Sequence, residues 1–224
     1  MVLAAFKDLC IDAVRPSVLG PFWGQVLGLE YVGLDHGAGR LVGPTPQHTV
    51  WVNAVPEPKS VKQRVHLDVH TAGVDELVAA GARVLEPAGE RHWTVLADPE
   101  GGELCGFVRE EVPDYRLYEV VVDCHRPRQV ARWWADVLGA ELGGDAGNDW
   151  WWLEPLPGAP FEGMVFVPVP EPKTVKNRVH WDVEVDDSAL LLQRGASLLR
   201  RRGSGTDWDV LADPEGNEFC AFTR

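Results

Sequence analysis

Each half of the chain combines a carboxylate, a histidine and a cysteine that could act together. The two sets are Asp8, His66 and Cys105 in the first half, and Glu119, His180 and Cys220 in the second. An imidazole, a carboxylate and a thiol together can hold a zinc or iron ion. In a cavity without metal, the carboxylate instead orients the histidine, and the thiol fills apolar space. We favour this second interpretation, because charged pairs in clefts are commonly structural.

Both sets belong to a long internal repeat. Residues 55–69 (VPEPKSVKQRVHLDV) recur at 169–183 (VPEPKTVKNRVHWDV), and the VLADPEG segment of residues 95–101 recurs at 210–216. The earlier Arg-Pro, Trp and Leu-Gly positions of the first copy also return in the second. Self-similarity of this length indicates a tandem duplication. We predict two domains, residues 1–112 and 113–224.

The elements that position these residues are predicted to form two βαβββ units in each copy. A strand at residues 5–11 precedes a helix that begins at Pro16 and ends before Gly28, the usual places for these residue types. Further strands are expected at residues 29–34, 40–43, 49–54, 65–70, 83–86, 94–97 and 103–108, with a second helix at 74–80. Asp98-Pro99-Glu100-Gly101 has the composition of a type I turn. The fold class is therefore α+β.

Four such units, with Leu-Gly closing the first helix, an H-x-D-V strand and a D-P-E-G turn, resemble the vicinal oxygen chelate superfamily. It includes glyoxalase I, extradiol dioxygenases and bleomycin-binding resistance proteins. The motifs VPEPKxVKxRVHxD and DPEGxExC further resemble actinobacterial glyoxalase-like domains. The resemblance implies two tandem glyoxalase-like domains forming an internal pseudo-dimer, with cupped sheets that hold a ligand. Each cup is built either within one copy or across the two.

Metal-dependent members hold a divalent ion on the first strand of each unit and on the last strands. The resemblance places the first-strand ligands of any bound metal at Asp8, His66, Glu119 and His180. The last-strand carboxylate is replaced by Cys105 and Cys220, while Glu103 and Glu218 lie two residues earlier, about 7 Å along the strand. The resemblance places a fourth ligand on the strand before each linker, and this position is apolar in both copies. No metal site is therefore assigned, and the cofactor is left unknown.

The ten tryptophans divide into matched and unmatched positions. Trp23 with Trp134, and Trp93 with Trp208, recur in both copies and are predicted to pack in the core. Trp51, Trp181 and residues 150–152 are unmatched, so they are candidates for stacking on a ligand or for contacts between the copies. The predicted ligand-binding residues are Asp8, Trp51, His66, Cys105, Glu119, Trp151, His180, Trp181 and Cys220. No catalytic residue is assigned.

Composition limits the partners. The formal charge of −13 argues against nucleic acid, and no apolar stretch is long enough to span a bilayer. Lys62, Arg64, Lys176 and Arg178 of the linkers are expected to pair with acidic residues rather than to clamp an anion. Without a signal peptide or a disulfide framework, the expected location is the cytoplasm. The chain is expected to be a monomer with an internal pseudo-dimer or a loose homodimer.

Two functions fit these observations. The first is metal-independent binding of a small aromatic or cationic molecule of the antibiotic-sequestering type. The alternative is a glyoxalase- or dioxygenase-like enzyme, a lyase, isomerase or oxygenase, that acts on a small oxygenated metabolite with a divalent metal. The fold resemblance is shared by both, so it does not choose between them.

Overall fold

The structure is a computed structural model that describes residues 2–203 and 205–224. The first copy contains β1 (Ala4–Ala13), α1 (Pro16–Leu27), β2 (Glu30–Gly33), β3 (Gly39–Val42), β4 (Val50–Ala54), β5 (Val65–Thr71), α2 (Val74–Ala80), β6 (Arg83–Glu86), β7 (Thr94–Ala97) and β8 (Glu103–Val108). The second contains β9 (Leu117–Cys124), α3 (Pro127–Leu138), β10 (Leu142–Asp145), β11 (Trp150–Leu153), β12 (Gly163–Pro168), β13 (Val179–Val185), α4 (Ser188–Gln193), β14 (Ser197–Arg200), β15 (Asp209–Ala212) and β16 (Glu218–Thr223). Short 3₁₀ turns lie at Asp35–Gly37 and Pro46–His48. No helix in the described part of the chain is long and apolar enough to cross a membrane.

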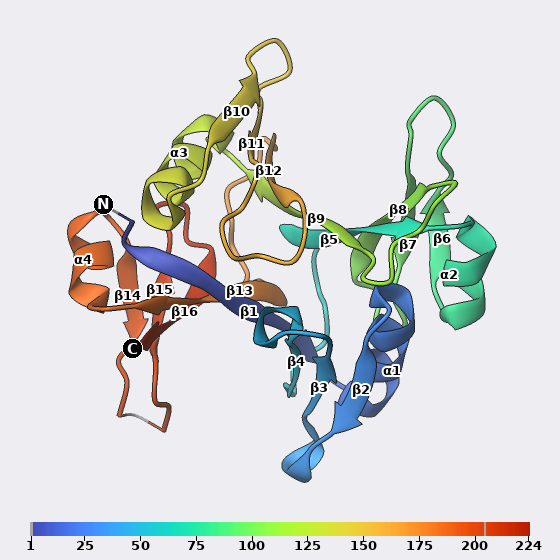
Figure 1. The fold of residues 1–224 in the computed structure, drawn as a ribbon, viewed down its shortest axis with the longest axis horizontal. Coiled ribbons are helices and arrows are strands. Elements are labelled where there is room, and N and C mark those ends of the chain that lie inside the picture. The colour runs from blue at the N-terminus through green and yellow to red at the C-terminus, as the bar shows by residue number, and fades with distance from the viewer. Residues whose placement is uncertain (1, 204) are drawn as a thin grey trace.

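The strands form two eight-stranded sheets, and each sheet combines one βαβββ unit of the first copy with one unit of the second. Sheet A has the order β14-β15-β16-β13-β1-β4-β3-β2, and sheet B has the order β10-β11-β12-β9-β5-β8-β7-β6. The two units meet where β1 pairs antiparallel with β13 in sheet A, and β5 with β9 in sheet B (Figure 1). The predicted α+β class is confirmed. Of the two possible assemblies, the structure has the one in which each sheet is built across the copies.

The two long helices begin and end as their sequences predict. Pro16 and Pro127 occupy their first turns, where the missing N–H costs nothing because no partner exists for it there. Gly28 and Gly139 end them in the left-handed conformation, with φ of 71° and 69°. A side chain at either position would be strained, so the Leu-Gly motif marks the point at which each helix must stop.

The D-P-E-G motif joins the two units of each copy. Asp98 Oδ1 accepts hydrogen bonds from the backbone of Glu100 and Gly102, both at 2.8 Å, which fixes the predicted turn. The Glu100 carboxylate then accepts from the backbone N–H groups of Val14 and Arg15 at 2.9 and 2.7 Å, just before α1. Glu215 binds the backbone before α3 in the same way. The glutamate of the motif, Glu100 or Glu215, therefore connects the second unit of each copy to the first through hydrogen bonds.

The hydrophobic core lies on one face of each sheet. Trp23 and Trp134 are 2% and 0% exposed, which confirms their predicted place. Trp134 meets Trp181 of β13 and Phe219 of β16, with ring centres 4.9 and 5.0 Å apart. The prediction that Trp181 contacts a ligand is therefore wrong, because this side chain is 1% exposed and packs in the core.

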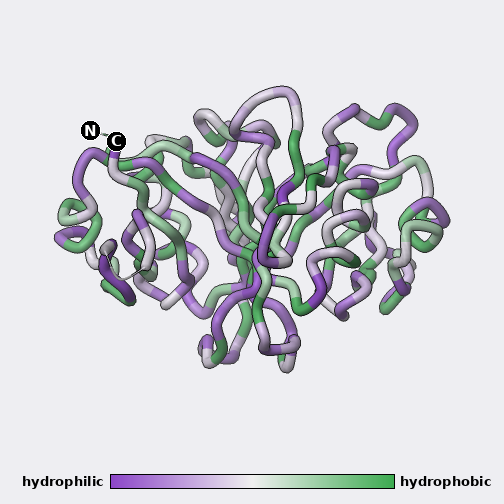
Figure 2. The backbone as a smooth tube through the Cα atoms, turned by 90° about the horizontal axis from the view of Figure 1, so that it is seen from below, coloured by the Kyte–Doolittle hydropathy of each residue, from purple (hydrophilic) through white to green (hydrophobic). Residues whose placement is uncertain are grey.

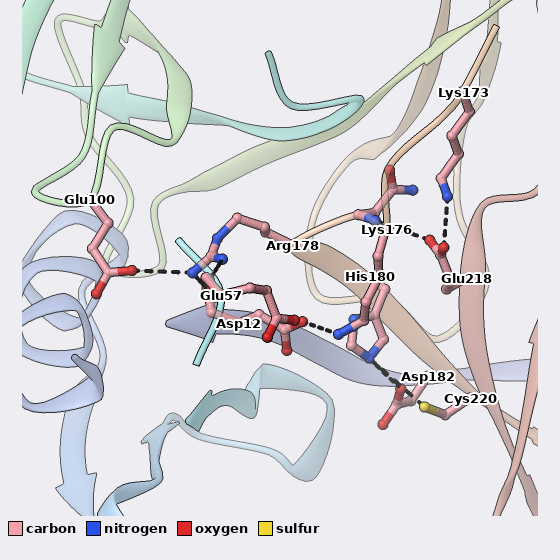
Figure 3. Close-up of polar contacts among 11 residues, drawn as sticks. Asp12, Glu57, Glu100, Lys173, Lys176, Arg178, His180, Asp182, Glu218 and Cys220 are labelled. Atoms are coloured by element: carbon pink, nitrogen blue, oxygen red, sulfur yellow. Dashed lines mark hydrogen bonds and ion pairs between the residues drawn. The ribbon is translucent and has the colours of Figure 1, made fainter. Parts of the chain in front are cut away.

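The linkers between units are held by ion pairs and carbonyl contacts. Lys62 pairs with Asp123 and Lys176 with Asp12, as expected from the acidic composition of the copies. Arg178 donates to the carbonyl oxygens of Glu57 and Asp12 at 2.7 and 2.8 Å. It also donates to the Glu100 carboxylate at 3.2 Å (Figure 3). Arg178 of the second copy thus contacts three residues of the first copy. Figure 2 shows the molecule as two similar lobes.

Candidate functional site

Each sheet carries one cluster of polar side chains on the face opposite its core. We call the cluster on sheet B site B, and the cluster on sheet A site A. Site B consists of His66 and Asp68 on β5, Cys105 on β8 and Glu119 on β9. Site A consists of Asp8 and Cys10 on β1, His180 and Asp182 on β13 and Cys220 on β16. Alternation along the strands explains the clusters, since Leu67 between His66 and Asp68, and Trp181 between His180 and Asp182, are fully buried in the core.

In site B the histidine and the aspartate lie close together without forming an ion pair. His66 Nε2 is 3.4 Å from Asp68 Oδ1, and the two residues belong to one metal-sized group with Cys105, whose ligand atoms all lie within 4.8 Å. Burial lowers the pKa of His66 to about 4. Burial and the neighbouring Glu119 raise the pKa of Asp68 well above its usual value. His66 is therefore neutral at pH 7, and burial favours the neutral form of Asp68 in the same way.

A cavity of about 610 Å³ opens over site B. Its walls include five aromatic residues from four strands and their flanking loops: Trp93, Phe107, Tyr118, Trp150 and Trp152. Trp93 stacks on Phe107 with ring centres 5.7 Å apart, and Tyr118 meets Phe107 edge-on at 5.2 Å. The volume and the mixture of aromatic and polar walls are typical of small-molecule sites.

The cavity has an excess of acidic groups. Asp123 pairs with Lys62, Glu86 pairs with Arg91, and Glu103 pairs with Lys59. Asp68, Glu119 and Glu154 also line it, and none of these three has a cationic partner within ion-pair distance in the described residues. Burial, followed by repulsion from Glu162 and Glu154, raises the pKa of Glu119 to about 7. A cation in the cavity would relieve this repulsion.

In site A the corresponding space is used by the protein's own side chains. Asp8, the equivalent of Glu119, accepts from Lys7 Nζ at 2.6 Å and from Trp51 Nε1 at 3.1 Å. The Lys7 ammonium lies 4.3 Å from the ring centre of Phe222. Site B has Tyr118 where site A has Lys7, so its carboxylate lacks this internal cation. The two sites are thus related by the repeat but differ in charge.

Site A also brings together more metal-ligating atoms. Cys10 Sγ is 3.6 Å from Asp182 Oδ2, and His180 Nε2 is 3.8 Å from both Asp182 Oδ1 and Cys220 Sγ (Figure 3 shows all but Cys10). Burial and the negative charge of Asp8 raise the pKa of Asp182 to about 8. Burial also raises the pKa of Cys10 and lowers that of His180.

The donor atoms of both sites fit a soft divalent ion better than a hard one. Each site offers an imidazole, a carboxylate and at least one thiol, the mixture that zinc accepts and that magnesium avoids. Several of these buried atoms have no hydrogen-bond partner in the described residues: His66 Nδ1, Asp68 Oδ1, Asp8 Oδ1, His180 Nδ1 and Asp182 Oδ1. On the strands before the linkers, Val165 and Val167 face site B and add no donor.

The structure brings most of the predicted residues to these two sites. Site B gathers His66, Cys105 and Glu119, and site A gathers Asp8, Trp51, His180 and Cys220. The predicted pairing of Asp8 with His66 and of Glu119 with His180 is therefore wrong, because each sheet joins a first strand of one copy to the histidine strand of the other. Trp151 is placed elsewhere, since its Nε1 donates to Asp149 and its ring faces Arg128, 5.0 Å from the ring centre. Its neighbours Trp150 and Trp152 line the cavity instead, because alternate residues of a strand face opposite sides.

Sequence reasoning missed part of both sites. Trp93 was assigned to the core because it recurs in the second copy, yet it lines the cavity. Its equivalent Trp208 stacks on Phe222 in sheet A, 4.9 Å between ring centres. The recurrence was misleading because both sheets have a ligand-facing side. The parity of Glu103, Cys105 and Phe107 on one strand was the signal that could have placed Phe107.

Comparison with known proteins supports the fold rather than a reaction. The model of the glyoxalase-like domain matches residues 8–107 and again 119–222. No curated protein matches the chain. Glyoxalase I from Zea mays has the same fold, with 11% identity and a TM-score of 0.67 over 98% of this chain and 92% of that one. A candidate dioxygenase from Bacillus subtilis gives 15% identity and a TM-score of 0.62 over 98% and 86%.

These matches agree with the topology and with the duplicated motifs. The similarity in fold extends over most of the length of both solved structures. At such low identity the similarity concerns the fold alone, so the chemistry of the relatives is not transferred. The chain belongs to the glyoxalase-like domain family, of which it contains two tandem copies, within the vicinal oxygen chelate superfamily.

Proposed function

We propose that the protein binds a small planar organic cation in the cavity over site B, without requiring a metal there. The observation that carries this proposal is the combination of an aromatic wall with carboxyl groups that lack cationic partners. A binding role of the antibiotic-sequestering type follows from these properties. The cavity volume of about 610 Å³ suits a drug-sized molecule.

The charge of the cavity supports a cation. Glu119 on β9 and Asp68 on β5 are register partners. Burial, followed by repulsion from neighbouring carboxylates, raises the pKa of both, with Glu119 acting on Asp68, and Glu162 and Glu154 acting on Glu119. A bound cation would stabilise their charged forms, so binding and deprotonation reinforce each other. An anionic ligand would add to the repulsion.

The aromatic wall supports a planar ligand. Guanidinium groups of Arg91 and Arg109 already lie 6.0 and 5.3 Å from the ring centres of Trp93 and Phe107. These rings therefore attract cations from within the chain, as the negative face of an aromatic ring does. Trp150 is 40% exposed at the rim, where it can cover a ligand after entry.

The repeat supplies a matched pair of variants for the test. Trp93→Ala removes a stacking surface from the cavity, whereas Trp208→Ala removes the equivalent ring from sheet A. With berberine as a planar cationic probe, we expect Trp93→Ala to weaken binding by about tenfold or more, the value of one desolvated cation–π contact. Trp208→Ala should change it by less than about twofold. Isothermal titration calorimetry measures both affinities.

The anionic aromatic probe 8-anilinonaphthalene-1-sulfonate serves as the charge control. Berberine should bind more tightly than this probe, and chelator treatment should leave its affinity unchanged. Equal losses in the two tryptophan variants, or tighter binding of the anion, would contradict the proposal.

Binding should also depend on pH through Glu119. The raised pKa of about 7 means that the carboxyl is mostly protonated at pH 6 and mostly charged at pH 8. A cation that needs the charged form should therefore bind about tenfold more tightly at pH 8 than at pH 6. Glu119→Gln should lower the affinity at pH 8 and flatten this profile. An unchanged profile in Glu119→Gln, measured by tryptophan fluorescence titration, would exclude Glu119 as the cation's partner.

A second candidate function is an enzyme that uses a divalent metal at site B. It is favoured by the grouping of His66, Asp68 and Cys105 within 4.8 Å, which are the residues that would hold the ion. A metal there would supply Lewis-acid activation of a substrate oxygen. In that case Glu119, with its pKa near neutrality, is placed to accept or return a proton in the same cavity. Turnover of a bound molecule that stops on chelation distinguishes this candidate from binding alone.

A further inference from the structure

The two sites differ at one position that has not entered the proposed function. Cys10 on β1 pairs with His180 on β13, and the equivalent residue on β9 is Val121, which pairs with His66 on β5. Both side chains are buried, at 4% and 6% exposure. The repeat has therefore placed a thiol beside the histidine of site A and a methyl-bearing side chain beside that of site B.

We propose that site A is a thiolate site for a zinc-class divalent ion, held by Cys10, His180 and Asp182 with Cys220 as the fourth donor. Two of these donors, Cys10 and Asp182, lie outside the ligand positions that the family resemblance assigns to this sheet, namely Asp8 and His180. The site therefore has a donor set of its own, with two sulfur atoms, one nitrogen and one oxygen.

The spacing of the donor atoms supports the assignment. Cys10, His180 and Asp182 each offer a ligand atom within 4.8 Å of the others. Cys10 Sγ lies 3.6 Å from Asp182 Oδ2, and His180 Nε2 lies 3.8 Å from both Asp182 Oδ1 and Cys220 Sγ. With zinc bonds of about 2.0 to 2.3 Å, neighbouring tetrahedral ligands lie about 3.3 to 3.8 Å apart. Cys10, His180 and Asp182 are thus close to the required spacing before any ion is bound, while Cys220 lies outside this group of three and contacts it through His180.

Burial of unpartnered atoms is the second, independent observation. Asp182 is 3% exposed and His180 is 8% exposed, yet Asp182 Oδ1 and His180 Nδ1 have no hydrogen-bond partner among the described residues. Asp8, 3% exposed, also leaves Oδ1 without one. Buried polar atoms without partners are rare because each costs about 1–3 kcal/mol. A cation bound through Asp182 Oδ1 offsets that cost for this atom, which is the unpartnered atom that belongs to the proposed donor set.

Site B should hold such an ion less tightly. It has three donors, His66, Asp68 and Cys105, and Val121 closes the place of the fourth. Structural zinc sites are almost always four-coordinate with protein ligands alone. Site B also opens into the large cavity, so its three donors face a ligand-sized space. The Cys10/Val121 difference therefore favours metal binding at site A over site B, which stays open to an organic ligand.

Cobalt(II) titration of the chelator-treated protein tests the proposal, because thiolate–cobalt bonds absorb in the near ultraviolet while other ligands do not. We expect the full chain to bind one equivalent of cobalt with this band, and zinc to displace it. Cys10→Val copies the residue of site B and should weaken cobalt binding by at least about 100-fold. Val121→Cys copies the residue of site A and should create a second equivalent with the same band. Neither change introduces a polar atom without a partner beyond those already present.

Cys124→Ala is the control for loss of a thiol. Cys124 is buried on β9 away from both sites, and its equivalent in the first copy is Ala13. This variant should keep the full band, and circular dichroism should show all variants folded. The absence of a charge-transfer band in the unmodified chain would overturn the proposal. So would a band that survives in Cys10→Val, or two equal equivalents in the unmodified chain.

Discussion

Residues 1–112 expressed alone are expected to fold only as a dimer. In the full chain β1 pairs with β13 and β5 pairs with β9, so the first copy without the second has two open strand edges. Leu67 and Val69 on β5, and Leu9 on β1, would also lose the neighbouring strand that keeps them buried. A second molecule of the same fragment can supply both missing strands, because β5 is the repeat equivalent of β13 and β1 is the repeat equivalent of β9. Each sheet would then be restored with β1 of one molecule against β5 of the other.

The concentration dependence of folding checks this expectation. Light scattering of the fragment should give twice its monomer mass, and its melting temperature should rise with concentration, as it does when folding requires association. The full chain should melt at a temperature independent of concentration. A fragment that remains monomeric and folded at high dilution would show that one copy completes its own sheets in isolation.

Arg178→Met is expected to destabilise the chain by about 3 kcal/mol or more. The guanidinium is 12% exposed and binds three acceptors, the carbonyl oxygens of Glu57 and Asp12 and the carboxylate of Glu100. Methionine keeps much of the apolar stem but leaves these acceptors without their donor. Removing one partner of a buried ion pair typically costs about 3–5 kcal/mol, because the remaining charge stays desolvated.

Arg64→Met is the matched control, since Arg64 holds the same position in the first copy. It donates to the carbonyl of Glu171, and the Glu215 carboxylate, equivalent to Glu100, pairs instead with Arg126 at 3.5 Å. Urea unfolding of both variants should show a clearly larger loss for Arg178→Met. Similar losses would mean that the carbonyl contacts, and not the carboxylate, account for the stabilisation.

The local elements follow from the sequence because their signals are local. Pro16 and Gly28 mark the ends of α1 through backbone conformations that those residue types favour. The alternation of His66, Asp68 and the residues between them places a polar cluster on one face. The pairing of strands across the copies could not be predicted in this way. β5 and β13 begin with the same Val-His-x-Asp-Val pattern, so this pattern does not distinguish β1 from β9 as a partner.

The tryptophans show a different limit. Trp181 is adjacent to His180 on β13, so its side chain points to the opposite face of the sheet, which is the core side. The difference between the two copies at this position had instead suggested contact with a ligand. Trp93 is the opposite case, because it is matched in the second copy and still lines the cavity. A difference between the copies shows only that the residue has diverged. The face of the sheet that the residue occupies determines its environment. The face is the better guide to contact with a ligand.

The crossing of units between the sheets has a consequence for how this gene can change. If a single copy assembled as a homodimer, every codon would be expressed twice and both cups would acquire each mutation together. In the fused chain each unit occurs once, so a codon such as that of Cys10 changes one cup and leaves the other intact. Fusion therefore allows two cups that share a common ancestor and a common scaffold to specialise separately within one polypeptide.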